Sequence, residues 1–161
     1  MALYPDLLKG DFERLPPALR QFHSAPGGAK GKGIATVRHA NKLVAWLAGF
    51  PPEGENIPLQ LEVVAGENQE VWIRRFGKTV LKSVQRQSGG LIAESFGPVK
   101  ILLRVTVEDS RMSAVSESVR CWFIPLPLRV TATEWGDGTH WEFDVNVRGL
   151  GSYRGVMGPV R

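Results

Sequence analysis

Residues 70–107 read EVWIRRFGKTVLKSVQRQSGGLIAESFGPVKILLRVTV, and this stretch decides the fold. Hydrophobic and polar side chains alternate along much of it, and the alternation is interrupted at Gly77-Lys78, Gly89-Gly90 and Gly97-Pro98. Alternation with a period of two predicts strands that bury one face, and a two-residue interruption that contains glycine predicts a tight hairpin turn. The stretch therefore predicts four consecutive antiparallel strands.

Two-residue turns also fix which residues lie opposite each other on neighbouring strands. The three turns predict these opposite pairs: Trp72 and Ser83, Arg74 and Leu81, Gln85 and Glu94, Phe96 and Val99, Ile92 and Leu103. Propagated through the turns, the register gives one apolar face, made of Trp72, Phe76, Leu81, Ile92, Phe96, Val99, Ile101, Leu103, Val105 and Val107. We expect this face to be the interior of the sheet, because the other face carries charged side chains such as Lys82, Arg86, Lys100 and Arg104.

The same alternation extends to both sides of this stretch. It predicts further strands at 33–39, 59–64, 112–120, 127–135, 140–147 and 152–157. A turn at Asp137-Gly138 would place Val130 opposite Val145 and Ala132 opposite Phe143. About ten strands joined by short turns predict an α+β fold, mainly an antiparallel meander curled into a barrel-like sheet.

Helical patterns are confined to the first third of the chain. Residues 1–25 predict short helices, 26–33 a flexible linker rich in glycine, and 34–161 a strand-rich body within a single domain, 1–161. A further helix is expected at 41–50, between the first and second strands, where Asn41 can cap the amino end. Its apolar stripe, Leu43, Val44, Trp46 and Leu47, predicts a helix that packs over an opening of the sheet.

Composition excludes several classes of protein. The 161 residues carry a net charge of +4, with no basic run longer than two residues, which argues against nucleic-acid binding. The apolar runs at 43–50 and 121–128 are far shorter than the roughly 20 residues of a membrane-spanning helix, and the first residues do not resemble a secretion signal. A lone cysteine, Cys121, and three scattered histidines predict no disulfide, metal site or cofactor. We expect a cytoplasmic protein without a membrane span.

Several polar residues occupy positions that the register assigns to the interior: Arg74, Ser83, Gln85, Glu94, Ser116, Ser118, Arg120 and Glu134. Buried charges are costly unless paired, so these positions either lie at a wet rim or form a polar cluster that orients a ligand. On a flat sheet, Arg74 and Glu94 would be separated by about 14 Å along the strands and about 10 Å across them. Only strong curvature would let the two side chains meet.

Five segments together resemble a known family: LYPDLLKGDFERLPPALRQFH (3–23), WIRRFG (72–77), LIAESFGPVK (91–100), WEFDV (141–145) and GSYRG (151–155). In order and spacing they are similar to a bacterial domain of unknown function catalogued as number forty-one sixty-six. The positions that match its pattern are Trp72, Arg74, Phe76, Glu94, Phe96, Gly97, Tyr153, Arg154 and Gly155. The resemblance implies no activity, although members of the family occur alone or joined to oxidoreductase-like modules.

The sequence favours a domain that binds a small, largely apolar or amphipathic ligand inside the sheet without catalysis. The residues expected to line the site are Trp72, Arg74, Phe76, Ser83, Glu94, Phe96, Trp141, Phe143 and Tyr153. One alternative is an accessory module for an oxidoreductase-like partner. Another is a helix-grip enzyme of the cyclase type that uses Arg74 and Glu94, although that fold ends in a long helix where this chain has GSYRGVM.

Overall fold

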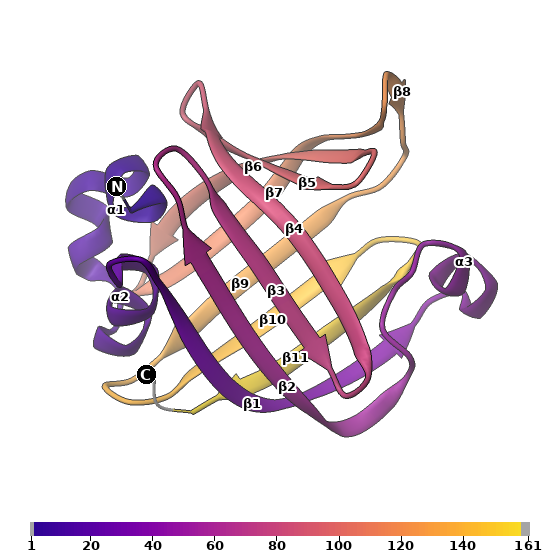
Figure 1. Cartoon of the computed structure of the whole chain (residues 1–161), viewed down its shortest axis with the longest axis horizontal. Helices are drawn as coiled ribbons and strands as arrows, with labels where there is room; N and C mark the ends of the chain where they lie inside the picture. Colours follow the sequence, from indigo (N-terminus) through magenta and orange to yellow (C-terminus); the bar gives the residue numbers. More distant parts are fainter. Residues whose placement is uncertain (1, 159–161) are drawn as a thin grey trace.

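Ten antiparallel strands close into a barrel in the computed structural model, which describes residues 2–158 (Figure 1). The strands are β1 Gly28–His39, β2 Gly54–Ala65, β3 Glu70–Phe76, β4 Thr79–Ser88, β5 Leu91–Phe96, β6 Val99–Glu108, β7 Arg111–Cys121, β9 Val130–Gly136, β10 Trp141–Val147 and β11 Gly151–Met157. Each of these strands pairs with the next, and β11 pairs with β1 to close the ring. A short strand, β8 (Ile124–Pro125), pairs only with the end of β7. The predicted barrel-like meander is confirmed.

The register predicted from the three glycine turns is confirmed. Trp72 lies opposite Ser83, Gln85 opposite Glu94, and Phe96 opposite Val99. Alternate residues of β3 to β6 therefore face the lumen, and Trp72, Phe76, Ile92, Ile101 and Leu103 among them are buried. The charged side chains that were expected on the outer face, Lys82, Arg86, Lys100 and Arg104, are exposed. On the outer face of the later strands and turns, Arg129, Glu142, Asp144 and Arg148 are exposed as well.

The register predicted for β9 and β10 is wrong by two residues. Val130 lies opposite Val147, not Val145, because the loop has four residues and not two. The Asp137 carboxylate accepts hydrogen bonds from the backbone N–H groups of Thr139 (2.8 Å) and His140 (2.9 Å), which builds the longer loop. A shift of two residues leaves the inward and outward faces of both strands unchanged.

A β-bulge in β7 overturns two of the predicted inward positions. The pairing of β6 with β7 shifts between Leu102–Ser118 and Leu103–Ser116, so that Glu117 is an extra residue. Beyond the bulge the alternation along β7 reverses, since one inserted residue exchanges the two faces. Ser118 and Arg120 therefore face outward. Ser116 stays inward, where its hydroxyl accepts a hydrogen bond from the backbone N–H of Val130 at 2.9 Å.

The helical amino-terminal segment closes one end of the barrel (Figure 1). It consists of α1 (Leu3–Leu8), a 3₁₀ helix η1 (Lys9–Arg14) and α2 (Pro17–Ser24). Helix α2 begins with a proline and buries Leu19 and Phe22 on one side. The ring of Phe22 lies 5.1 Å from that of Trp141 and 5.8 Å from that of Trp72, so the helix packs directly on the barrel core.

The expected linker at 26–33 is mostly strand, because β1 begins at Gly28. Its glycines allow close packing. A Cβ atom on Gly33 would lie 2.0 Å from the carbonyl oxygen of Val156 on β11. A sequence that looks flexible is therefore the closely packed seam that closes the barrel.

The third helix, α3 (Lys42–Leu47), lies at the opposite end of the barrel from the other helices (Figure 1). The Asn41 side chain caps it as predicted, accepting a hydrogen bond from the Val44 N–H at 3.1 Å. The expected packing of its apolar stripe is wrong, because Leu43, Val44, Trp46 and Leu47 are all exposed. The helix is short and stands beyond the strand ends, so only Ala45 is buried. No helix within residues 2–158 is long and apolar enough to cross a membrane.

Candidate ligand-binding site

The barrel encloses a cavity of about 540 Å³. Its wall is mainly apolar, with side chains from β2 to β7 and β9 to β11, and includes Ile101, Leu103, Met112, Val130 and Phe143. At the α3 end the lining includes Leu47, Phe50, Pro98, Leu126 and Leu150. At the other end it reaches Tyr4 of α1. We call the α3 end the mouth of the barrel.

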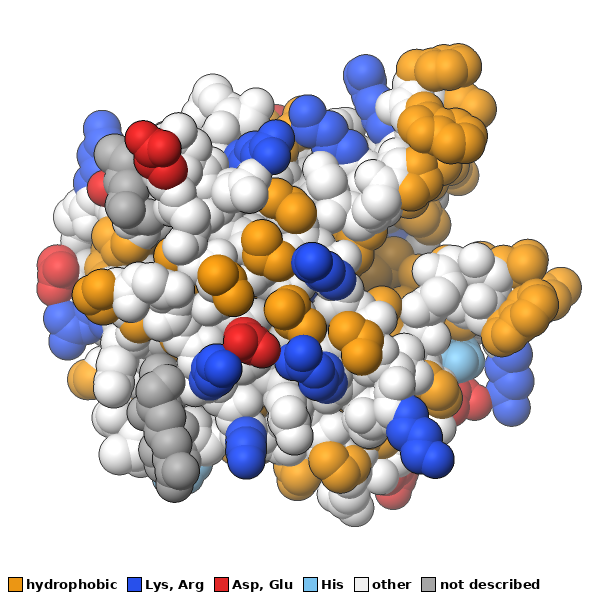
Figure 2. Space-filling model, viewed as in Figure 1, with side chains coloured by type: hydrophobic (Ala, Val, Ile, Leu, Met, Phe, Trp, Pro, Cys, Tyr) orange, Lys and Arg blue, Asp and Glu red, His pale blue; other side chains and the backbone are white. Residues whose placement is uncertain are grey.

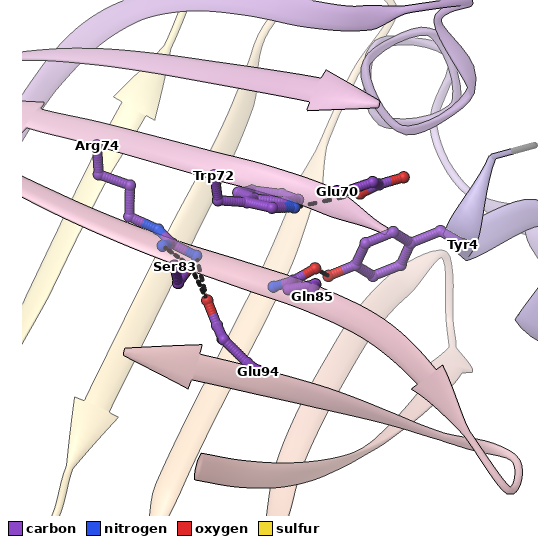
Figure 3. A network of polar contacts seen from close by, with 7 residues as sticks. All are labelled: Tyr4, Glu70, Trp72, Arg74, Ser83, Gln85 and Glu94. Carbon is purple, nitrogen blue, oxygen red and sulfur yellow. Dashed lines mark hydrogen bonds and ion pairs between the residues drawn. The ribbon is translucent and has the colours of Figure 1, made fainter. Parts of the chain in front are cut away.

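A charged cluster lies on the cavity wall (Figure 3). The Arg74 guanidinium donates from Nη2 to Glu94 Oε1 at 3.0 Å and from Nη1 to Ser83 Oγ at 2.9 Å. The Ser83 hydroxyl in turn donates to Glu94 Oε1 at 2.6 Å. The Arg74 and Glu94 side chains are only 13% and 8% exposed. The curvature of the barrel thus brings together two residues that a flat sheet would separate.

Aromatic rings hold the Arg74 guanidinium in place. Its central carbon lies 5.0 Å from the ring centre of Trp72 and 5.8 Å from that of Phe96, distances typical of cation–π contacts. Burial opposes the charge of Arg74, but the charge and hydrogen bond of Glu94, together with Tyr153 and Tyr4, outweigh this effect and raise the arginine pKa. Arg74 is therefore a fixed cation whose charge is neutralised by Glu94.

Tyr153 contributes a neutral hydroxyl to the cavity. Burial raises its pKa; Arg74 counteracts this effect, while Glu94 and Glu134 add to it. Its ring packs against those of Phe76 (5.0 Å), Phe50 (5.8 Å) and Phe143 (6.0 Å). Its hydroxyl makes no hydrogen bond with another residue in the described range 2–158, so it can serve a ligand.

A second polar group ties the amino-terminal helices to the barrel (Figure 3). The Tyr4 hydroxyl donates to Gln85 Oε1 at 3.0 Å. The Glu70 carboxylate accepts from the Leu3 N–H and from the Trp72 indole N–H, both at 3.1 Å. Burial, followed by the nearby carboxylates, raises the pKa of Tyr4 well above its ordinary value, so its hydroxyl stays protonated.

The imidazole of His23 forms a third buried contact, with Glu134. His23 Nε2 lies 3.0 Å from Glu134 Oε2, and the imidazole ring is 4.2 Å from the ring of Tyr4. The other ring nitrogen, Nδ1, is buried and has no partner in the part of the chain that the structure describes. Glu134 lines the cavity, and it was among the inward polar positions that the register predicted.

Eight of the nine predicted site residues line the cavity: Trp72, Arg74, Phe76, Glu94, Phe96, Trp141, Phe143 and Tyr153. Ser83 lies behind the wall and joins the site through its bonds to Arg74 and Glu94. Sequence reasoning missed Tyr4, His23 and Glu70. Glu70 could have been found, because it shares the inward parity of Trp72 and Arg74 on the same strand.

The fold and the site together define a class: a closed, up-and-down β-barrel with a mainly apolar lumen and the Arg74–Glu94 ion pair on its wall. A family model described as domain of unknown function (DUF4166) matches residues 15–156, and the chain belongs to this family. The matched range covers β1 to β10 and most of β11. Comparison with curated proteins and comparison with solved structures each found no match.

The helix-grip alternative required a long helix at the carboxyl-terminal end of the sheet. Residues 151–157 instead form strand β11, which closes the ring against β1. In addition, Arg74 and Glu94 are bonded to each other, which leaves neither free to act as an independent acid or base. The described residues therefore lack the closing helix on which the helix-grip alternative depends.

Proposed function

We propose that the barrel binds a small, largely apolar molecule with a neutral polar end. The observation that carries this proposal is the cavity of about 540 Å³ beside the Arg74–Glu94 pair. Small-molecule sites are typically apolar pockets of roughly 300–1,000 Å³ with a few well-placed polar groups. A protein interior without a ligand to hold is normally packed without voids larger than a water molecule.

Charge in the lumen favours a neutral polar end over a carboxylate. Among residues 2–158 the arginine on the cavity wall is Arg74, which is already paired with Glu94, and Glu134 adds a second acidic side chain. A ligand carboxylate would have to compete with Glu94 for Arg74 and would be repelled by both acids. A hydroxyl or carbonyl group could instead accept a hydrogen bond from Tyr153, whose raised pKa keeps its proton in place.

A neutral hydrophobic fluorophore such as Nile red tests whether the cavity binds ligands. We expect saturable binding with a dissociation constant of about 1 μM, which corresponds to about −8 kcal/mol. Ala132→Phe should weaken it strongly, because Ala132 lines the cavity and a phenyl ring there would occupy part of the space that the fluorophore needs. Thr131→Phe is the matched control, since the adjacent residue of the same strand faces the opposite side. Equal binding by both variants would refute a site inside the barrel.

Competition against the bound fluorophore tests the polar end. A long-chain alcohol should displace it better than the carboxylate of the same chain length. Tyr153→Phe should reduce the advantage of the alcohol, by up to about tenfold for one hydrogen bond. If the carboxylate competes better, the neutral-end assignment is wrong even though the cavity binds.

A further inference from the structure

Two groups of exposed apolar side chains project from the mouth of the barrel. Trp122 and Phe123, in the turn between β7 and β8, are 74% and 83% exposed. Trp46 and Leu47 of α3 are 73% and 70% exposed. Figure 2 shows these two hydrophobic projections at the same end of the molecule, with a hollow between them. We call them the β8 tip (122–124) and the α3 tip (43–47).

Both tips are anchored parts of the structure. The Trp122 N–H donates to the Pro98 carbonyl at 2.8 Å, which fixes the β8 tip to the turn between β5 and β6. The α3 tip is held by the Asn41 cap and by the bond from the Phe50 N–H to the Ala45 carbonyl at 2.9 Å. The chain thus holds large apolar side chains in water at fixed positions, which marks an interaction surface.

The charges around the two tips are mostly positive. The segments at the mouth, 38–55, 77–78, 97–100, 120–129 and 148–150, carry seven basic side chains: Arg38, Lys42, Lys78, Lys100, Arg120, Arg129 and Arg148. Their two acidic side chains are already paired, Glu53 with Lys42 at 3.4 Å and Glu55 with Arg38. The other five basic residues form no ion pair within the described residues.

At the opposite end of the barrel, acidic side chains outnumber basic ones. Its helices and turns carry seven acidic side chains, Asp6, Asp11, Glu13, Glu67, Glu108, Asp109 and Asp137, and four basic ones, Lys9, Arg14, Arg20 and Arg111. The net charge of +4 is therefore unevenly distributed, with the excess at the mouth. A negatively charged surface would attract the mouth end first and orient the molecule.

We propose that the mouth docks on an anionic lipid bilayer, with the β8 and α3 tips inserted at the interface. Tryptophan and other apolar side chains favour the interface between lipid and water, and nearby Lys and Arg add attraction to anionic head groups. This arrangement would point the opening of the cavity at the lipid. A second copy of the chain is a poorer occupant, because two mouths face to face would bring two sets of like charges together.

Vesicle flotation at about 0.1 M salt tests the docking, with phosphatidylcholine vesicles compared to phosphatidylcholine vesicles containing phosphatidylglycerol. We expect at least about tenfold stronger binding to the anionic vesicles and loss of binding at high salt. The double variant Trp46→Ser/Phe123→Ser should reduce it by about tenfold or more. Val64→Ser/Val156→Ser is the matched control, because these exposed valines lie on the outer wall away from the mouth.

Brominated lipids supply a second measurement. Bromine in the acyl chains should quench tryptophan fluorescence of the wild type, and a Trp46→Phe/Trp122→Phe variant should lose this quenching. Of the three tryptophans that remain, Trp72 and Trp141 are buried, and Trp135 lies beside Arg111 at the end of the barrel opposite the mouth. Equal flotation with neutral and anionic vesicles, no flotation, or equal binding by the mouth and control variants would overturn the proposal. So would a concentration-dependent dimer that dissociates in the Trp46→Ser/Phe123→Ser variant. None of these outcomes bears on fluorophore binding, so the docking and the cavity can fail separately.

Discussion

Removal of the arginine from the Arg74–Glu94 pair should strongly destabilise the barrel. Both side chains are almost fully buried, and in an Arg74→Met variant Glu94 would keep only the hydroxyl of Ser83 as a partner. Breaking a buried pair in this way costs about 3–5 kcal/mol, because a buried carboxylate loses its cation. Urea unfolding followed by circular dichroism at pH 7 measures the loss.

A double-mutant cycle separates this loss from simple packing. In Arg74→Met/Glu94→Gln, the uncharged amide can still accept from Ser83, and no buried charge is left, so the double variant should recover at least about 2 kcal/mol. The control is Arg104→Met, which removes the arginine of an exposed pair with Glu117 and should change stability by no more than about 1 kcal/mol. If Arg74→Met costs no more than Arg104→Met, or if the double variant is no more stable than the single one, the reasoning about the buried pair is refuted.

Two further predictions concern the seam and the tyrosines. Gly155→Ala should lower the free energy of unfolding by about 1–3 kcal/mol, because the added Cβ would lie 2.1 Å from the Ile34 carbonyl oxygen. Gly138→Ala is the control, since its Cβ would have nothing within 4 Å and the variant should be nearly as stable as the wild type. Equal losses of stability in urea unfolding would contradict this prediction. Burial raises the pKa of Tyr4 and Tyr153 in the folded protein above the pKa in the unfolded chain. The contribution of each protonated tyrosine to the free energy of unfolding is therefore fully present below about pH 10. It is lost as the pH rises further, by up to about 1.4 kcal/mol per pH unit for each tyrosine. Unfolding between pH 9 and 11 should show a shallower decline in Tyr4→Phe/Tyr153→Phe, and an unchanged decline would count against the raised values.

Local turn chemistry explains where sequence reasoning succeeded. Gly77, Gly89, Gly90 and Gly97 all adopt positive φ angles, which glycine tolerates at little cost, so each two-residue turn and its register could be predicted. The length of the loop after β9 was predicted wrongly on the same basis. There an aspartate side chain, and not a glycine, sets the length by binding two backbone N–H groups.

Three features depend on contacts between segments distant in the sequence. The bulge at Glu117 is set by the partner strand β6, so the pattern of β7 alone could not predict that Arg120 is exposed. The apolar stripe of α3 has no partner because the helix stands beyond the strand ends. The bond from Tyr4 to Gln85 joins residues 81 positions apart, and no local signal links them.

The sequence by itself determined the alternation, the turns and hence the inward position of Arg74, Ser83, Gln85 and Glu94. These are local properties, because a period of two and a tight glycine turn act over a few residues. Only the tertiary structure decided that Arg74 and Glu94 touch and that β11 closes on β1. It also decided that a cavity of about 540 Å³ stays open inside the barrel, beside the Arg74–Glu94 pair. Closure of the ring curves the sheet, and curvature sets the distances across the lumen that a sequence pattern cannot contain.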